Sequence, residues 1–469
     1  MTGLPGLLAG VLLPWAAGFA LVRLLLARAG ERDPWVEAGY GHFVGVLLVA
    51  LLLRAQDLAG MRLAFVPVAA VLALVALAAF VLAQRAHRGA AAAAAVERSA
   101  DPLAIRWLAA IALVLIALRI GTLAVEVLLR PLFAWDAWSQ WATKAKVWSA
   151  LRDIVPFIGY DDWLARKPGY TDTAPHYPAT IPLLQTWMAL AIGRFDDALV
   201  NAPWLAGFVA LGLGVFGQLR RLAVGTAWAT IATWLVLSLP LLDTHVALPG
   251  YADFHLAAAY ALAALALAQW ESSPSRGALV LFVAGAVLLP LLKVPGIAWL
   301  GTLALGLAIA RFGTTPARIV GIGAAVLAVT VAGGMFVGSA KVAVDPASTQ
   351  YRVVESLVRH LFAFGNFHLL WYLLPLVLAA GWRELVALKA TTIALLAGFG
   401  FLLWTFLFTQ AGDWVVDYTT VNRALLHIAP ALTAYAALVA WRWAVARAPT
   451  RVAVPLDAPS DPPPAATSA

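Results

Sequence analysis

The chain has 469 residues, of which 63% are hydrophobic and only 12% are charged, and it contains no cysteine. Soluble domains are typically about half apolar and about a quarter charged, so this composition excludes an ordinary soluble protein and favours one covered by lipid. The formal charge of +8 does not indicate nucleic-acid binding, because most Arg and Lys residues lie at the ends of apolar segments. Without cysteine, disulfides and thiolate metal sites are excluded.

Apolar runs long enough to cross about 30 Å of hydrocarbon recur along the chain, and strand-like alternation is absent. We therefore expect an all-α integral membrane protein with about thirteen transmembrane helices. The spans are predicted near Leu4–Ala27, Gly41–Leu53, Leu63–Ala83, Leu103–Leu129, Ala202–Phe216, Leu222–Leu242, Ala252–Trp270, Ala278–Leu292, Val294–Ala310, Ile319–Val337, Leu361–Ala380, Ala390–Phe408 and Ala424–Ala440.

The basic residues orient these spans. Arg28 and Arg32 follow the first span, which predicts an external N-terminus and a cytoplasmic first loop. The apolar segment Ile181–Ile192 is too short to cross at about 1.5 Å per residue. Counting it as a span would also place Arg220 and Arg221 outside, so we expect it to lie along the periplasmic surface.

Three regions follow from this topology. Residues 1–102 form additional N-terminal transmembrane helices, residues 103–446 form the main membrane domain, and residues 447–469 are rich in Pro, Ala and Ser and are typical of a disordered cytoplasmic tail. A large periplasmic loop with juxtamembrane helices is expected at residues 130–200. The abundance of Ala, Arg and Gly is typical of GC-rich bacterial genomes, so we expect a bacterial inner-membrane protein whose working face is periplasmic.

The start of this loop carries the most informative pattern in the chain. On a helix, Asp136, Gln140 and Lys144 follow one another at i, i+4 and i+8 and would share a polar face. The opposite face would hold aromatic and small residues at headgroup depth: Trp138, Trp141, Ala145 and Trp148. The pattern predicts an interfacial helix that presents its polar face to a lipid phosphate; a plain interfacial anchor with solvated charges fits it equally well.

Two further polar features precede predicted helices. His176 and Tyr177 lie between prolines, in a segment that predicts a helix start, although prolines that merely shape a turn are the simpler interpretation. Asp253 begins a predicted span, where an acid is favoured by the helix dipole and would only cap the helix.

Two charged residues fall within apolar surroundings. Lys293 lies between two short apolar helices, where a lysine is costly unless it faces a cavity or an opposite charge, and this favours a functional role. Arg119 lies in the middle of a span, with Glu126 on the same face two turns later, so a structural pair is expected there.

The order of these features resembles that of the GT-C-fold glycosyltransferases that use lipid-phosphate-linked sugars. This family (glycosyltransferase family 39-like) includes the protein mannosyltransferases and the bacterial aminoarabinose transferase of lipid A. The resemblance extends over roughly Leu103 to Ala440 and predicts a GT-C-like bundle. It rests on a loop aspartate after a span, a proline-rich helix start, paired arginines, a second acid, a Leu-x-Lys-x-x-Gly element and a final Arg-x-x-x-His-x-x-Pro element: Asp136, Pro175–Pro178, Arg220, Arg221, Asp253, Leu291–Gly296, Arg423, His427 and Pro430.

The resemblance implies an inverting glycosyltransferase that moves a sugar from a polyprenyl-phosphate donor to a periplasmic lipid, glycan or protein. Asp136 matches the family's catalytic base, Asp253 its second periplasmic acid, and Lys293 the lysine near the donor phosphate. The remaining predicted substrate-binding residues are Lys144, Gln140, His176, Tyr177, Arg423 and His427. No cofactor or metal is predicted, because the acids are scattered singly. The expected partners are the donor, the acceptor and membrane lipids, without nucleic acid.

Other classes of membrane protein stay open. A transporter or flippase of a lipid-linked sugar would have broken spans and internal repeats; Lys293 between two short helices fits it, whereas no repeat is found. An O-antigen ligase or polymerase would carry its large periplasmic loop late in the chain rather than early. A purely structural membrane subunit would leave the pattern around Asp136 unexplained.

Overall fold

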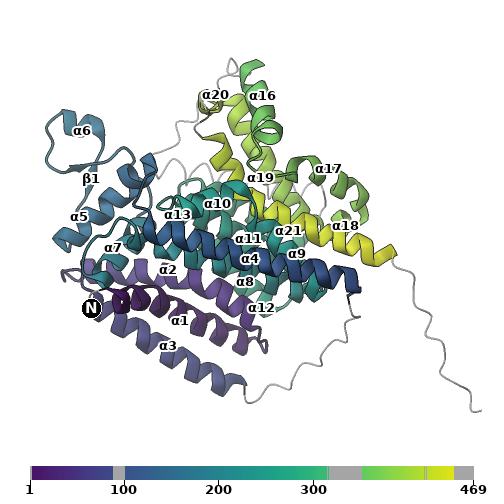
Figure 1. The fold of residues 1–469 in the computed structure, drawn as a ribbon, viewed down its shortest axis with the longest axis horizontal. Coiled ribbons are helices and arrows are strands. Elements are labelled where there is room, and N and C mark those ends of the chain that lie inside the picture. Colours follow the sequence, from purple (N-terminus) through teal and green to yellow (C-terminus); the bar gives the residue numbers. More distant parts are fainter. Residues whose placement is uncertain are drawn as a thin grey trace, which may run out of the picture.

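The structure is a computed structural model that describes residues 3–87, 101–313, 315, 351–416, 418 and 420–447. The predicted span Ile319–Val337 and the predicted disordered tail beyond Arg447 lie outside the described residues. Helices dominate the described part of the chain, which also contains one two-stranded parallel sheet that pairs Phe157 with Tyr170 in the loop after the fourth helix (Figure 1).

The first half of the described chain contains α1 (Leu4–Arg28), α2 (Pro34–Leu58), α3 (Phe65–His87), α4 (Leu103–Leu129), the π-helix η1 (Ala137–Ala142), α5 (Thr143–Leu151), β1 (Phe157–Ile158), α6 (Tyr160–Leu164), β2 (Tyr170–Thr171), α7 (Thr180–Ile192), the 3₁₀-helix η2 (Leu199–Asn201), α8 (Ala202–Arg221) and α9 (Thr226–Leu237). The second half contains α10 (Pro240–Ala247), α11 (Asp253–Ser272), α12 (Arg276–Ala286), α13 (Leu288–Leu292), α14 (Gly296–Phe312), α16 (Tyr351–Val358), the π-helix η4 (Arg359–Ala363), α17 (Leu370–Ala380), α18 (Trp382–Ala387), α19 (Lys389–Phe408), the 3₁₀-helix η5 (Gln410–Gly412), α20 (Asp413–Val416) and α21 (Val421–Arg447).

The chain is an all-α membrane protein. Among the described residues, seven helices are long and apolar enough to cross a membrane, or eight when α9 and α10, bent by 64° against each other, count as one span. The sequence predicts about thirteen. Three of the others are short apolar helices of 10–17 residues, Arg276–Leu292, Gly296–Phe312 and Leu370–Ala380. The predicted span Ile319–Val337 lies outside the described residues, and α11, which corresponds to the predicted span Ala252–Trp270, is not among the seven. The predicted span Leu361–Ala380 is divided, because η4 ends at Ala363 and α17 begins only at Leu370.

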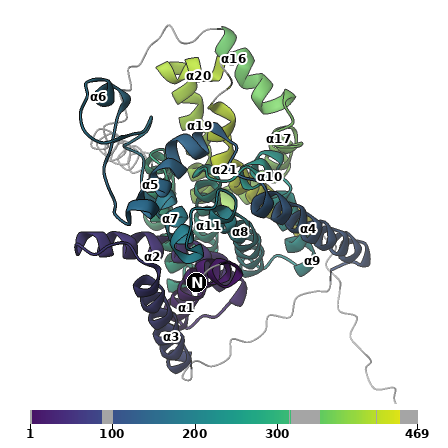
Figure 2. The ribbon, with the colours of Figure 1, turned by 60° about the vertical axis from the view of Figure 1, so that its left-hand side comes forward.

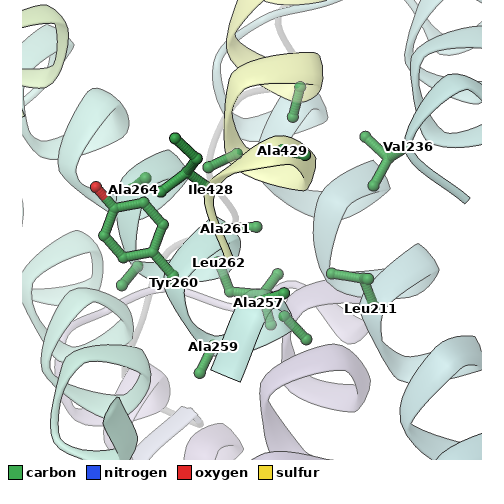
Figure 3. Close-up of a cluster of buried hydrophobic side chains, with 14 of the residues drawn as sticks. Leu211, Val236, Ala257, Ala259, Tyr260, Ala261, Leu262, Ala264, Ile428 and Ala429 are labelled. Carbon is green, nitrogen blue, oxygen red and sulfur yellow. The ribbon is translucent and has the colours of Figure 1, made fainter. Parts of the chain in front are cut away.

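Helix α11 is the centre of the bundle. Its side chains from Asp253 to Gln269 are buried all round, as expected of a helix without a polar face that packs on every side against other helices. Figure 3 shows its alanines and Tyr260 beside Ile428 of α21, with Leu211 of α8 and Val236 of α9 nearby. Its alanines allow the neighbouring helices to approach closely. The first residue of α11 therefore lies centrally at one end of the bundle.

The N-terminal helices share this core. Gly18 lies against the backbone of Gly41 and Gly45 where α1 crosses α2, and a side chain at Gly18 would overlap α2. Helix α2 packs on α8, and the hydroxyl of Tyr40 donates to the carbonyl of Leu262 in α11 at 2.6 Å. Residues 1–102 therefore contact the helix that carries Asp253.

Helix α7 corresponds to the apolar segment expected not to cross. At 13 residues it is too short to span, and twelve of its residues are buried, in contact with α1, α2 and α5. The indole of Trp187 donates to the carbonyl of Gly10 at 2.7 Å. Helix α7 is therefore covered by the N-terminal helices and α5, and its place at the periplasmic surface of the membrane stays a prediction.

The predicted ion pair between Arg119 and Glu126 is wrong. Arg119 lies with Nε 3.0 Å from the carboxylate of Asp243 in α10, and Glu126 pairs with Arg130 one turn later. Helix α10 packs against α4 (Figure 2) and thereby brings the buried carboxylate of Asp243 to Arg119, whereas Glu126 is seven residues away on α4.

Candidate functional site

The candidate site is organised around Asp253, the first residue of α11. Its side chain is 0% exposed, and it does not cap the helix: the N-cap is Ala252, without a side-chain hydrogen bond. Gly250, with a positive φ of 101°, turns the chain into α11 in the left-handed region that favours glycine. Gly250 also lies directly against Ala137, so the turn places Asp253 beside η1.

Three side chains from distant parts of the chain donate to the Asp253 carboxylate. Lys293 Nζ lies 2.7 Å and His427 Nε2 lies 2.8 Å from Oδ1. Arg423 Nη2 lies 3.1 Å from Oδ2. A carboxylate with three donors, two of them cationic, is satisfied as an anion without water.

Arg423 links Asp253 to the second predicted catalytic acid. Its Nη1 donates to Oδ2 of Asp136 at 2.5 Å, so one guanidinium bridges two carboxylates that are far apart in the sequence. The guanidinium carbon lies 4.7 Å from the ring centroid of Tyr251, a cation–π distance. The Asp136 side chain is 25% exposed, and Arg423 is its only hydrogen-bond partner among the described residues, so its other oxygen is open to solvent.

Lys293 reaches Asp253 because the chain is extended between two helices. Helix α13 ends at Leu292 and α14 begins at Gly296, with Lys293 at φ −158° and ψ 150°, as the sequence pattern predicts. Pro295 cannot donate a helical hydrogen bond, which favours the break. The hydroxyl of Thr180 donates to the carbonyl of Leu291 at 2.6 Å and ties the break to α7.

Lys144 does not join this site. Its ammonium lies 2.5 Å from the Asp172 carboxylate and donates to the carbonyl of Ala174 at 2.9 Å. Burial lowers the pKa of Lys144, and the bond to Asp172 opposes this shift. The shared face with Asp136 is wrong because residues 137–142 form a π-helix, whose i→i+5 bonds change the angular spacing that an α-helix would give.

The aromatic face of this segment is also different from the expected one. Trp141 and Trp148 are 0% and 4% exposed and pack into the protein, where the ring of Trp141 stacks on Tyr177 with centroids 5.2 Å apart. The exposed indoles are Trp135 and Trp138, in edge contact at 4.8 Å. The aromatic residues that face outward are therefore those before η1 and at its start.

The other predicted substrate contacts lie around the site rather than in its hydrogen-bond network. Burial raises the pKa of Tyr177, and the charge of Asp253 adds to this shift. His176 lies at the surface, and partial desolvation of its ring by the surrounding protein lowers its pKa, with a contribution from the charge of Lys144. Gln140 is half-buried on η1, and among the described residues its side chain has no recorded hydrogen bond.

Two residues of the site were not predicted. Tyr251 supplies the aromatic ring beneath Arg423; the Pro-Gly-Tyr sequence before Asp253 was the available signal. Trp299 donates its indole N–H to Nδ1 of His427 at 3.2 Å, and an apolar-helix tryptophan gives no sequence signal of such a role.

The five connected residues are Asp136, Asp253, Lys293, Arg423 and His427. The two carboxylates carry two negative charges, and Lys293 and Arg423 carry two positive charges. With a neutral His427 imidazole, the formal charge of the cluster is therefore zero. Such an arrangement offers one solvent-accessible carboxylate beside two cations, which suits proton removal next to a departing anion. Within the described ranges, no group of three His, Asp or Glu side chains is arranged to hold a metal ion. Comparisons of the chain with protein-family models, curated proteins and solved structures found no match.

Proposed function

We propose that this chain is an inverting membrane glycosyltransferase that transfers a sugar from polyprenyl phosphate to an acceptor at the periplasmic face of a bacterial inner membrane. One observation carries the proposal: Asp136 and Arg423, 287 residues apart, meet at 2.5 Å beside Asp253 and Lys293. Four elements of the resemblance to the GT-C glycosyltransferases thus contribute to one cluster: the loop aspartate, the second acid, the Lys293 element and the final Arg-x-x-x-His element. The paired arginines lie elsewhere, where Arg221 pairs with Glu31.

In this reaction Asp136 is the general base. The acceptor's oxygen or nitrogen attacks the anomeric carbon from the side opposite the phosphate, and its proton passes to the Asp136 carboxylate. The bond between the anomeric carbon and the phosphate oxygen breaks, so the configuration inverts and polyprenyl phosphate leaves with one additional negative charge. Asp136 suits this role better than Asp253, because Asp136 has an open carboxylate oxygen and Asp253 is fully buried and already accepts three hydrogen bonds.

The leaving phosphate requires cations, and Arg423 and Lys293 supply them. A planar guanidinium binds phosphate oxygens in a bidentate manner, and an ammonium adds a point charge. Binding of a donor phosphate to Arg423 would compete with its bond to Asp136 and release this carboxylate for the acceptor. Asp253 keeps both cations in place during this exchange, because it bonds to each of them independently.

An apolar groove supports the use of a lipid donor. A groove of about 530 Å³ lies between α9, α17 and α21, lined mainly by Trp228, Leu235, Phe367, Leu373 and Ala437. One of its lining residues, Thr433, lies six residues after His427, about 9 Å along the axis of α21. The polyprenyl chain of a donor bound at Arg423 requires such an apolar surface.

The experiment compares the glycolipids and glycans of cells that carry wild-type protein, no protein, or Asp136→Asn. Mass spectrometry should show a sugar modification that is lost in the deletion strain and in Asp136→Asn, at equal protein levels. Asp153→Asn is the matched control, because Asp153 is an exposed acid of the same loop and lies outside the cluster. Identical profiles in wild-type and Asp136→Asn cells would refute the proposed base.

A transporter or flippase of a lipid-linked sugar is the second candidate, because two observations favour it. The bend of 64° between α9 and α10 and the interruption at Lys293 are broken helices of the kind that transporters use. Protein reconstituted in liposomes with a fluorescent polyprenyl-phosphate sugar distinguishes the two. Movement of the intact lipid between leaflets without sugar transfer would favour the transporter, and a transferred sugar favours the enzyme.

A further inference from the structure

The imidazole of His427 is held between a donor and an acceptor. On one side, Trp299 Nε1 lies 3.2 Å from Nδ1 of His427; on the other, Nε2 of His427 lies 2.8 Å from Oδ1 of Asp253. His427 and Trp299 are 2% and 1% exposed, so water does not replace either bond. Neither residue touches the open side of Asp136, which separates them from the acceptor.

These two contacts determine the position of the imidazole proton. An indole N–H is a donor only, so Nδ1 must accept and therefore carries no proton. A carboxylate is an acceptor only, so Nε2 must carry the proton and donate it. We infer that Trp299 is a positioning residue that holds His427 as the neutral Nε2–H tautomer; its catalytic consequence rests on the proposed function.

The position of Trp299 is itself fixed by its surroundings. Its ring contacts Tyr260 of α11 and Phe401 of α19, with centroids 5.5 Å and 5.9 Å away. Its carbonyl accepts a hydrogen bond from the hydroxyl of Thr302 at 2.9 Å, and this hydroxyl lies 3.1 Å from that of Tyr260. Tyr260 is the aromatic ring seen beside Ile428 in Figure 3, so the buried core of α11 and α21 supports the indole.

The tautomer matters because Asp253 arranges both cations. The charged groups around His427 are Asp253 of α11, Lys293 between α13 and α14, and Arg423 on α21 itself. With a neutral His427, Asp253 shares its charge between Lys293 and Arg423 only. A protonated imidazole would compete with Lys293 and Arg423 for the Asp253 carboxylate. An Nδ1–H imidazole would direct the lone pair of Nε2 toward this carboxylate. Either change would loosen the cations that receive the phosphate.

Nitrogen NMR of ¹⁵N-histidine-labelled protein in micelles tests this arrangement directly, with His427→Gln used to assign the signal. We expect Nε2 of His427 to be protonated and Nδ1 to be bare from about pH 5 to pH 8. In Trp299→Phe, which retains a ring without the N–H, we expect the signal to depend on pH or to show both tautomers. The matched control is Trp187→Phe, which removes a buried indole bond to the carbonyl of Gly10 far from the site in the sequence.

An imidazolium or an Nδ1–H ring in wild-type protein would overturn the inference, as would an unchanged His427 signal in Trp299→Phe. The wild-type spectrum decides the tautomer even if Trp299→Phe folds poorly. The same spectrum decides the tautomer even if no sugar transfer is found. Failure of the inference is therefore distinguishable from failure of the proposed function.

The catalytic consequence is measured as a change in kcat. Trp299→Phe should reduce kcat about fivefold to tenfold, the effect of one lost hydrogen bond, and change KM for the donor less, because the cations act on the leaving phosphate. Trp187→Phe should not reduce kcat. His427→Gln should retain more activity than His427→Ala, because an amide can donate to Asp253 and accept from Trp299. An equal loss of kcat in His427→Gln and His427→Ala would show that hydrogen bonds on both sides of residue 427 do not determine the rate.

Discussion

Replacing Lys144 with Met tests what the buried pair of Lys144 and Asp172 does. The two side chains are 3% and 0% exposed, and the variant leaves Asp172 with a hydrogen bond from the amide of Ala174 but without its cation. Removing one partner of a buried ion pair costs about 3–5 kcal/mol. Because each 1.4 kcal/mol changes an equilibrium about tenfold, the loop between α5 and α7 should open at least about a hundredfold more often.

The assay uses the absence of cysteine in the natural chain. A single cysteine at Ala174, which is 6% exposed, reacts with maleimide only when the loop opens. The labelling rate in micelles should rise at least about a hundredfold in Lys144→Met. It should not change in Lys146→Met, because Lys146 is exposed on the same helix. Equal rates in wild type and Lys144→Met would refute the assigned role.

The double variant Lys144→Met/Asp172→Leu separates a structural role from phosphate binding. An apolar pair can replace a buried ion pair at little cost, so the labelling rate should return toward that of the wild type. Sugar transfer in this double variant should be close to that of the wild type, because the structure places Lys144 outside the cluster of Asp136 and Arg423. A closed loop with persistently weak donor binding would instead support the phosphate contact that the sequence predicts.

Three further outcomes are expected. Gly18→Val should lower the free energy of unfolding in micelles by about 1–3 kcal/mol, because a side chain there separates α1 from α2; unchanged stability would contradict this close contact. Arg119→Leu should lower the stability by about 2 kcal/mol or more and reduce protein levels, because it leaves the Asp243 carboxylate unpaired. Glu126→Gln should have little effect. Adding Asp243→Leu to Arg119→Leu should restore the protein levels. His176→Gln should leave sugar transfer unchanged from about pH 7 to pH 8, because burial and the charge of Lys144 lower the pKa of His176 and keep the ring neutral there; a loss that grows as the pH falls would reveal an imidazolium that binds the donor.

The sequence alone determined the class of the protein and much of the candidate site. The predicted boundaries of α4 match the structure, and the helices break at Lys293 as the pattern predicts. The sequence also identified Asp136, Asp253 and Arg423 as candidates. The predicted class, the bounds of α4 and the helix break are confirmed because lipid requires long apolar segments. The candidate residues could be singled out because charged residues at helix ends or breaks are rare in such a chain.

Local geometry decided which members of the Asp136 segment share a site. The i, i+4, i+8 spacing assumes an α-helix, whereas η1 is a π-helix, and Lys144 turns to Asp172. No propensity in Ala137–Ala142 predicts the wider turn, which occurs where the segment packs its Trp141 against Tyr177.

Tertiary structure alone decided the partners of the remaining polar groups. Helix α7 is buried within the protein because the N-terminal helices cover it, and Arg119 pairs with Asp243 because α10 packs against α4. The bond from Trp299 to His427 likewise joins two helices whose contact is not encoded in either segment. A hydropathy pattern specifies which residues avoid lipid, but the partner of a buried charge depends on which helices become neighbours, and that choice is made by packing over the whole bundle.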